Sequence, residues 1–172
     1  LVVLIFSAVS GKCTEYSFVE NQGQWESSIK FKSDIPGGFL LVKDNSLEYI
    51  FYSTQALSEA HGNKSTNGKL IPVKKVTLNF LNSNVGNVVS KSDPEKHLTN
   101  YFIGKNPKFW KSNVRSYSNL IVKNLYNNID FRIYTVNDKL KFEYIVHPKG
   151  NPGDIKLVYE GSRSITVNNA EI

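Results

Sequence analysis

Hydrophobic and polar residues alternate with a period of two along most of this chain, in short stretches separated by turn-forming residues. In one of the clearest stretches, Leu140, Phe142 and Tyr144 share one phase, and residues of mixed polarity alternate with them. This alternation is typical of β-strands that bury one face and solvate the other. No stretch after the first residues keeps a helical period over the roughly 10–12 residues that a confident helix needs.

Turn signals separate these stretches at regular intervals. The pairs Asp44-Asn45 and Asn127-Asn128 suit tight connections between antiparallel strands, and residues 148–154 form a cluster rich in Pro and Gly. The spacing of roughly 8–12 residues between turns predicts about nine or ten short strands. The predicted fold class is therefore all-β, and the architecture is an antiparallel β-sandwich.

Both ends of the chain carry their own signals. Residues 1–9 form an apolar run that ends in small residues and then turns polar, as in the core and cleavage region of a secretory signal peptide. The run is too short to span a bilayer, which takes about 20 apolar residues. We expect 1–13 to be a signal-peptide remnant, with a buried first strand as the alternative, and 14–172 to be a single β-sandwich domain. Since 164–172 reads as a strand, a turn and the start of another strand, we expect that domain to be truncated at its C-terminal end.

The composition is that of a globular protein. Of 172 residues, 40% are hydrophobic and 21% are charged, and the formal net charge is +6. A modest positive charge favours weak attraction to acidic surfaces, but Lys and Arg are spread along the chain and form no clustered footprint. We therefore predict no nucleic-acid partner.

Cofactor and metal chemistry finds no support in the sequence. His61, His97 and His147 are far apart and lack the spacing of metal ligands, and Cys13 is the single cysteine. No phosphate-binding loop and no nucleophile elbow is present. We expect no metal, no cofactor and no catalytic residue.

Paired carboxylates are the remaining route to an enzyme. Glu48, Asp130 and Glu143 lie on predicted strands, where each alternates with apolar neighbours and is expected to face solvent. Asp130 follows a turn directly, so its expected role is to accept hydrogen bonds from turn amides. Glycoside hydrolysis by two such acids is the third-ranked hypothesis.

Aromatic residues offer a second hypothesis, carbohydrate binding. The chain has nine Tyr, ten Phe and two Trp, most of them on the apolar phase of strands and hence in the core. Trp25, Phe109 and Trp110 lie in turn-rich contexts and are the candidates for exposure and for stacking on sugar rings. The alternative role for such a residue is to anchor a loop to the sandwich.

Three segments together carry a family resemblance: FVENQGQW at 18–25, the long segment from TNYFIGKNPKFWK to IDFRIY at 99–134, and LKFEYIVHPKGNPGD onward at 140–169. In order and spacing they resemble an uncharacterised N-terminal β domain of large secreted or cell-surface proteins of Bacteroidota. Two departures occur: Asn127-Asn128 stands where that family has Pro-Gly, and one residue is inserted before Gly150.

The resemblance implies a context rather than a reaction. In that family the domain stands ahead of β-propeller-like repeats, PKD or other Ig-like modules and a C-terminal gliding-motility or type IX secretion sorting domain. It therefore implies export and an adhesive or scaffolding role, with other modules of the same polypeptide as partners.

The leading hypothesis is a non-enzymatic module of a larger protein that is secreted, or exposed at the cell surface, through its signal peptide. Surface polysaccharide or another extracellular protein is the expected external partner, and no membrane span is expected. The alternative is a carbohydrate-binding module that uses Trp25, Phe109 and Trp110.

Overall fold

The computed structural model describes residues 3–4, 16–53, 55–58, 71–84, 89–102, 104–137 and 139–162. Within the expected signal-peptide remnant it describes only a two-residue strand, β1 (Val3–Leu4), which pairs with β12. The last predicted strand, at 164–169, lies outside the described residues, as does the predicted truncation point. Helical structure in the described part is limited to one turn at 55–58 and two 3₁₀ turns, η1 (Pro107–Phe109) and η2 (Pro152–Asp154).

The described strands are antiparallel, and most of them join one sheet. In chain order they are β2 (Phe18–Glu20), β3 (Ile29–Ile35), β4 (Gly38–Lys43), β5 (Ser46–Tyr52), β6 (Val73–Phe80), β7 (Val89–Pro94), β10 (Ser116–Tyr126), β11 (Ile129–Val136), β12 (Lys139–Val146) and β13 (Leu157–Glu160). The sheet order is β1-β12-β11-β10-β2-β3-β4-β5-β6-β13, and β7 pairs with β10 beside this path. Two more strands, β8 (Thr99–Tyr101) and β9 (Lys111–Val114), form a separate hairpin.

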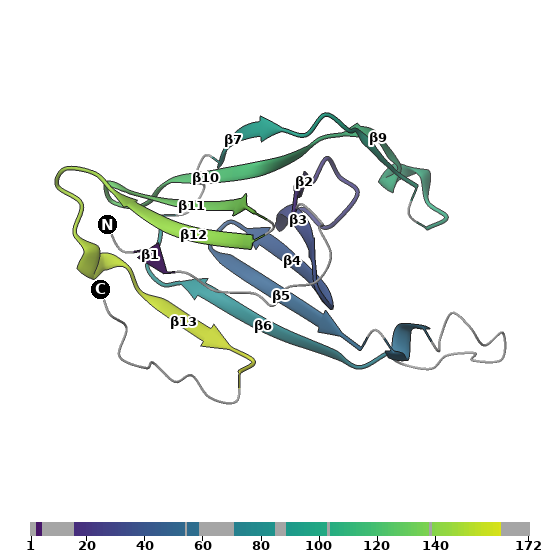
Figure 1. Ribbon diagram of the computed structural model, residues 1–172, viewed down its shortest axis with the longest axis horizontal. Helices are drawn as coiled ribbons and strands as arrows, with labels where there is room; N and C mark the ends of the chain where they lie inside the picture. The colour runs from purple at the N-terminus through teal and green to yellow at the C-terminus, as the bar shows by residue number, and fades with distance from the viewer. Residues whose placement is uncertain are drawn as a thin grey trace.

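The sheet curls so that its two halves face each other (Figure 1). β10, β11 and β12 form one layer, β3 to β6 and β13 form the other, and the short strand β2 connects them. Phe80 of β6 meets Phe131 of β11 with ring centroids 5.0 Å apart, so the layers pack directly. The predicted all-β antiparallel fold is confirmed, and its two layers are parts of one continuous sheet.

The core consists of the inward-facing residues that the alternation predicts. The most completely buried apolar side chains are Phe18, Leu40, Val42, Leu47, Val114, Leu120, Leu125, Ile129, Phe131 and Ile133. Each buried Val, Leu, Ile or Phe contributes about 1.5–3 kcal/mol relative to an exposed one. On β11, Phe131 and Ile133 face this core, whereas Asp130 and Arg132 lie on the opposite face of the sheet.

Asparagines shape the connection between β10 and β11. Asn124 and Asn128 adopt positive φ angles of 53° and 57°, a conformation that Asn tolerates better than most residues. The register between the strands shifts between Val122 and Tyr126, which marks a β-bulge. The Asn124 side chain accepts a hydrogen bond from the Asn128 amide at 2.9 Å. The predicted Asn127-Asn128 turn is therefore confirmed, and a bulge precedes it.

Candidate functional site

The β8–β9 hairpin extends beyond the two layers of the sheet (Figure 1). Its strands pair with each other and with no other described strand. Thr99 is opposite Val114, and Tyr101 is opposite Lys111, with an irregularity between the two pairs. Val114, at the base of the hairpin, is buried, while the turn of the hairpin lies away from the layers (Figure 1).

Local sequence signals fix the turn of this hairpin. Gly104 has a φ of 67°, which favours glycine. The Asn106 side chain caps η1 by accepting a hydrogen bond from the Lys108 amide at 3.0 Å, and Pro107 follows as the first residue of that turn. The Trp110 indole Nε1 donates a hydrogen bond to the Gly104 carbonyl at 3.2 Å. The Gly, Asn-Pro and Trp of this segment are thus all explained by its conformation.

Three aromatic rings are exposed on the outer part of this hairpin. Phe102 is 62% exposed, Phe109 is 43% exposed and Trp110 is 42% exposed. Phe102 and Trp110 pack edge to face with their ring centroids 5.8 Å apart. The expected exposure of Phe109 and Trp110 is confirmed, although Trp110 also anchors its own loop. Phe102 was not among the candidates, but it directly follows Tyr101, and adjacent residues of an extended segment point to opposite sides.

The third candidate, Trp25, lies in the loop between β2 and β3, and Asn21 organises that loop. The Asn21 side-chain oxygen accepts hydrogen bonds from the amides of Gly23 at 2.9 Å and Trp25 at 3.2 Å. Its side-chain nitrogen donates to the carbonyls of Glu26 at 2.8 Å and Ile29 at 2.7 Å. Gly23 has a φ of 104°, a backbone conformation that residues with a side chain rarely adopt.

Gln24 completes the same loop from inside. Its side chain is buried, with the oxygen accepting from the Gln22 amide at 2.6 Å and the nitrogen donating to the Glu20 carbonyl at 2.7 Å. Both ends of the amide are therefore paired, as a buried Gln requires. The polar residues of FVENQGQW build a defined loop, and the position of Trp25 follows from it.

This loop supports the base of the β8–β9 hairpin. Trp25 packs edge to face on Tyr101 with ring centroids 5.3 Å apart. A Cβ atom added to Gly23 would lie 3.2 Å from Cε of Lys111, so the Lys111 side chain crosses closely over that glycine. Two segments that the sequence analysis singled out separately are therefore neighbours in space, with Trp25 at the base of the hairpin and Trp110 near its turn.

One charged residue of β3, Lys32, lies near Trp25. The Lys32 ammonium lies 4.6 Å from the ring centroid of Phe39 and 5.8 Å from that of Trp25, and 3.4 Å from the Asp34 carboxylate. Burial raises the pKa of Tyr101, and Asp34 raises it further. The Tyr101 phenol therefore stays neutral at physiological pH. Trp25 is half-buried in this cluster, so its surroundings suit a structural contact better than open stacking on a ligand.

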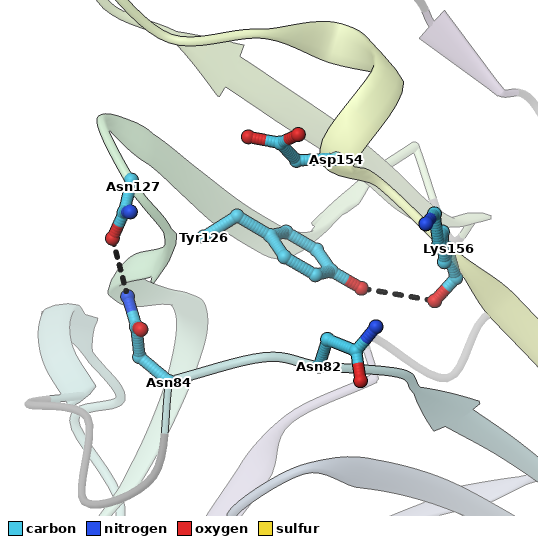
Figure 2. A pocket seen from close by; sticks show the side chains of 6 residues that line it. All are labelled: Asn82, Asn84, Tyr126, Asn127, Asp154 and Lys156. Atoms are coloured by element: carbon cyan, nitrogen blue, oxygen red, sulfur yellow. Dashed lines mark hydrogen bonds between the residues drawn. The ribbon is translucent and has the colours of Figure 1, made fainter.

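A shallow polar recess lies at a different place in the fold (Figure 2). It has a volume of about 220 Å³ and is lined by Asn82, Asn84, Tyr126, Asn127, Asp154 and Lys156. The Tyr126 hydroxyl donates to the Lys156 carbonyl at 3.0 Å, and the Asn84 side chain contacts that of Asn127 at 3.5 Å. Sequence reasoning missed this recess because its asparagines occur in turns, where Asn is expected for backbone reasons alone.

Asp130 is engaged by two partners and largely buried. Its carboxylate accepts a hydrogen bond from the Asn124 amide at 2.7 Å, and His147 Nε2 lies 3.0 Å from the other oxygen. Burial raises the pKa of Asp130, but these hydrogen bonds and the nearby charges of His147 and Lys123 lower it more, so the pKa is below its ordinary value. The expected hydrogen bond to a backbone amide near the turn is confirmed.

The other two strand acids are also paired. Glu48 binds the Lys43 ammonium at 2.9 Å, and Glu143 binds the Arg132 guanidinium at the same distance. The side chains of Asp130, Glu48 and Glu143 are only 12, 13 and 16% exposed. The prediction that these acids face open solvent is therefore wrong. The long side chains of Lys43 and Arg132 cover Glu48 and Glu143, and the Asn124 amide and the His147 ring cover Asp130.

In the ranges that the structure describes, no cluster of three or more His, Cys, Asp or Glu side chains has the geometry to hold a metal ion. No helix within those ranges combines the length and the hydrophobicity needed to cross a membrane.

These features define an all-β domain with a projecting hairpin that exposes aromatic side chains. The chain belongs to the family described as Domain of unknown function (DUF7948), which matches residues 18–172. The match begins at Phe18, the first residue of FVENQGQW, so the predicted membership of an uncharacterised domain family is confirmed. No curated protein and no solved structure matches the chain.

Proposed function

We propose that this domain is a non-enzymatic binding module of a larger secreted or cell-surface protein, with a role in adhesion or scaffolding. The observation that carries the proposal is the exposure of Phe102, Phe109 and Trp110 on a hairpin that extends beyond both layers. Grouped exposed aromatic side chains are a common mark of interaction sites, since their burial drives binding.

The extracellular context rests on sequence features. The apolar run at 1–9 suits the core of a secretory signal peptide. The motif segments resemble the N-terminal domain of secreted Bacteroidota proteins, which carry β-propeller-like repeats, Ig-like modules and a type IX or gliding-motility sorting domain. We infer that this domain works beside such modules in one polypeptide.

Carbohydrate binding is the second candidate, and one observation favours it. The Phe109 and Trp110 rings are each more than two-fifths exposed, as stacking on a sugar ring requires. Glycoside hydrolysis has less support, because Glu48, Asp130 and Glu143 are each occupied by a cation or an amide. A hydrolase would need two of these acids turned toward a common substrate.

Protease accessibility on intact cells tests the proposed location. The full-length protein is followed with an antibody against this domain, and proteinase K is added to intact and to lysed cells of the native host. We expect degradation on intact cells, or recovery of the protein from the medium, while a cytoplasmic marker stays intact. Degradation only after lysis would contradict the proposal.

A further inference from the structure

The net positive charge of this protein arises from one part of the sequence, where basic residues occur without acidic ones. Residues 96–129 contain five Lys, one Arg and no Asp or Glu. The rest of the chain carries equal numbers of basic and acidic residues, so this segment accounts for the whole net charge of +6. Lys and Arg residues occur along the whole chain, but residues 96–129 lack the Asp and Glu residues that balance their charge elsewhere.

This segment includes the whole β8–β9 hairpin, and two of its lysines lie at the turn. Lys105 and Lys108 are exposed, and neither has an ion-pair partner among the described residues. Elsewhere the strands hold several cations in ion pairs, as Glu48 does for Lys43 and Glu20 for Lys91. The hairpin thus combines exposed aromatic rings with unneutralised ammonium groups.

We propose that this surface, which we name the aromatic–lysine tip (Phe102, Lys105, Lys108, Phe109 and Trp110), binds an acidic polysaccharide. The proposal rests on the proposed extracellular binding function and names its ligand class. The exposed rings stack on the apolar C–H faces of sugar rings, and the ammonium groups pair with uronate carboxylates. Charge complementarity selects an acidic polymer over a neutral one.

The composition of the tip favours a polysaccharide over the other two macromolecular partners. Protein interfaces enrich Arg and deplete Lys around their aromatic residues, and this tip has Lys without Arg. Nucleic-acid sites use several Lys and Arg contacts to phosphates, often with Arg forks, whereas the turn offers two lysines. Two exposed ammonium groups beside exposed aromatic rings suit a chain of uronic acids.

Charge reversal at the turn tests the electrostatic part. The Lys105→Glu/Lys108→Glu variant of the full chain is titrated with polygalacturonate by isothermal calorimetry, beside the wild type. Its matched control is Lys139→Glu/Lys149→Glu, since Lys139 is exposed at the start of β12, Lys149 is exposed in the turn after β12, and neither has an ion-pair partner in the described part. We expect a loss of affinity of about tenfold or more for the first variant and a smaller loss for the control.

The aromatic part is tested by Phe109→Ala. Phe109 is 43% exposed, and no ring contact ties it to another aromatic residue of the described part. We therefore expect the variant to keep the fold, which circular dichroism checks. We expect about a fivefold loss of affinity that persists when the salt concentration rises from about 20 to 200 mM, because stacking is not screened. The effect of Lys105→Glu/Lys108→Glu should shrink over the same range.

Four results would overturn the inference. They are no binding of polygalacturonate by the wild type, equal binding of the neutral polymer dextran, tighter binding of oligo-dT, and loss of binding on Lys156→Glu in the polar recess. None of these four binding results contradicts the proposed function at the cell surface, provided that the protein is degraded on intact cells. Protection of the protein on intact cells would instead remove the proposed function itself, whatever the polymer result.

Discussion

The Asn21 side chain contacts backbone groups on both arms of the loop between β2 and β3, and so determines where Trp25 lies. Its oxygen holds the amides of Gly23 and Trp25, and its nitrogen holds the carbonyls of Glu26 and Ile29. No other residue type supplies donors and acceptors in this short geometry. The polar residues of FVENQGQW, a segment that carries part of the family resemblance, are thus explained by the conformation of this loop.

Asn21→Ala should therefore destabilise the protein. Removing the amide leaves several backbone groups without their partner, although water reaches part of the loop, so we expect a loss of about 1–3 kcal/mol. Gln22→Ala is the matched control, since Gln22 is exposed and only its backbone amide is used. Thermal unfolding measures both, and equal stability of the two variants would show that Asn21 does not hold the loop.

Asp130 predicts a pH dependence at the residue scale. Because its pKa is lowered in the folded state, the charged carboxylate adds stability above the unfolded pKa of about 3.9, and this stability is lost as the pH falls through the folded pKa. Asp130→Asn keeps an oxygen for the Asn124 amide but cannot titrate. We expect the free energy of unfolding of the wild type to fall more steeply below about pH 4 than that of the variant. Denaturant titrations across this range measure it, and parallel curves would contradict the assignment.

At the scale of elements, the two tryptophans lie at opposite ends of the β8–β9 hairpin: one supports its base and the other is exposed near its turn. Trp25 is half-buried against Tyr101 at the base, whereas Trp110 is exposed near the turn and contacts Phe102. The two indoles therefore have different consequences for stability. Gly104 and Asn106 shape the turn of the hairpin, and Trp110 directly follows that turn in the chain.

Trp25→Ala should lower the melting temperature more than Trp110→Ala. The first removes a half-buried ring that joins the hairpin to the loop, and we expect a loss of about 2–3 kcal/mol. The second removes an exposed ring and one exposed hydrogen bond, and about 1 kcal/mol is expected. Differential scanning calorimetry compares them. A drop of several degrees for Trp110→Ala, with no ligand bound by the wild type, would assign Trp110 a purely structural role.

At the scale of the whole molecule, the two layers of the curled sheet meet through an aromatic cluster centred on Phe131. Its ring lies 5.0 Å from Phe80, 6.0 Å from Phe142 and 5.2 Å from Tyr144, measured between centroids. Phe80 belongs to the opposite layer, and the other two rings belong to the neighbouring strand. This cluster therefore holds the layers together.

Phe131→Ala should cost about 3–5 kcal/mol, because it leaves a cavity between the layers. Val136→Ala, near the exposed end of the same strand, is the control and should change stability by about 0.5 kcal/mol or less. Urea denaturation measures both variants. A loss below about 1 kcal/mol for Phe131→Ala would mean that the layers do not depend on this contact.

The sequence predicted the strands with the clearest alternation, and the reason is local. On β12, alternate residues meet the core and the outer surface, so the period of two is visible in the chain itself. β7 was missed because its residues are mostly polar and end at Pro94, as suits a strand beside the main path. The sheet order and the curl depend on contacts between distant segments, which periodicity does not encode.

The candidate site was predictable in part for a similar reason. Turn-forming neighbours marked Phe109 and Trp110 for exposure, and both are exposed. The contact between Trp25 and Tyr101 joins distant segments and was not predictable from either one. Glu48 and Glu143 show the converse error: their phase pointed outward, but an outward residue on a sheet is covered when a long cationic neighbour lies across it.

The most direct test of a binding hairpin uses the two indole N–H signals of the chain, which belong to Trp25 and Trp110. In proton–nitrogen correlation spectra, polygalacturonate is added to the ¹⁵N-labelled full chain. We predict that the Trp110 indole and the amides of residues 104–106 and 108–111 shift, while the Trp25 indole and the amides around Asn82 and Asn127 stay in place. Shifts centred on the polar recess, or no shift at the hairpin at saturating polymer, would contradict the assignment of the aromatic–lysine tip as the binding site.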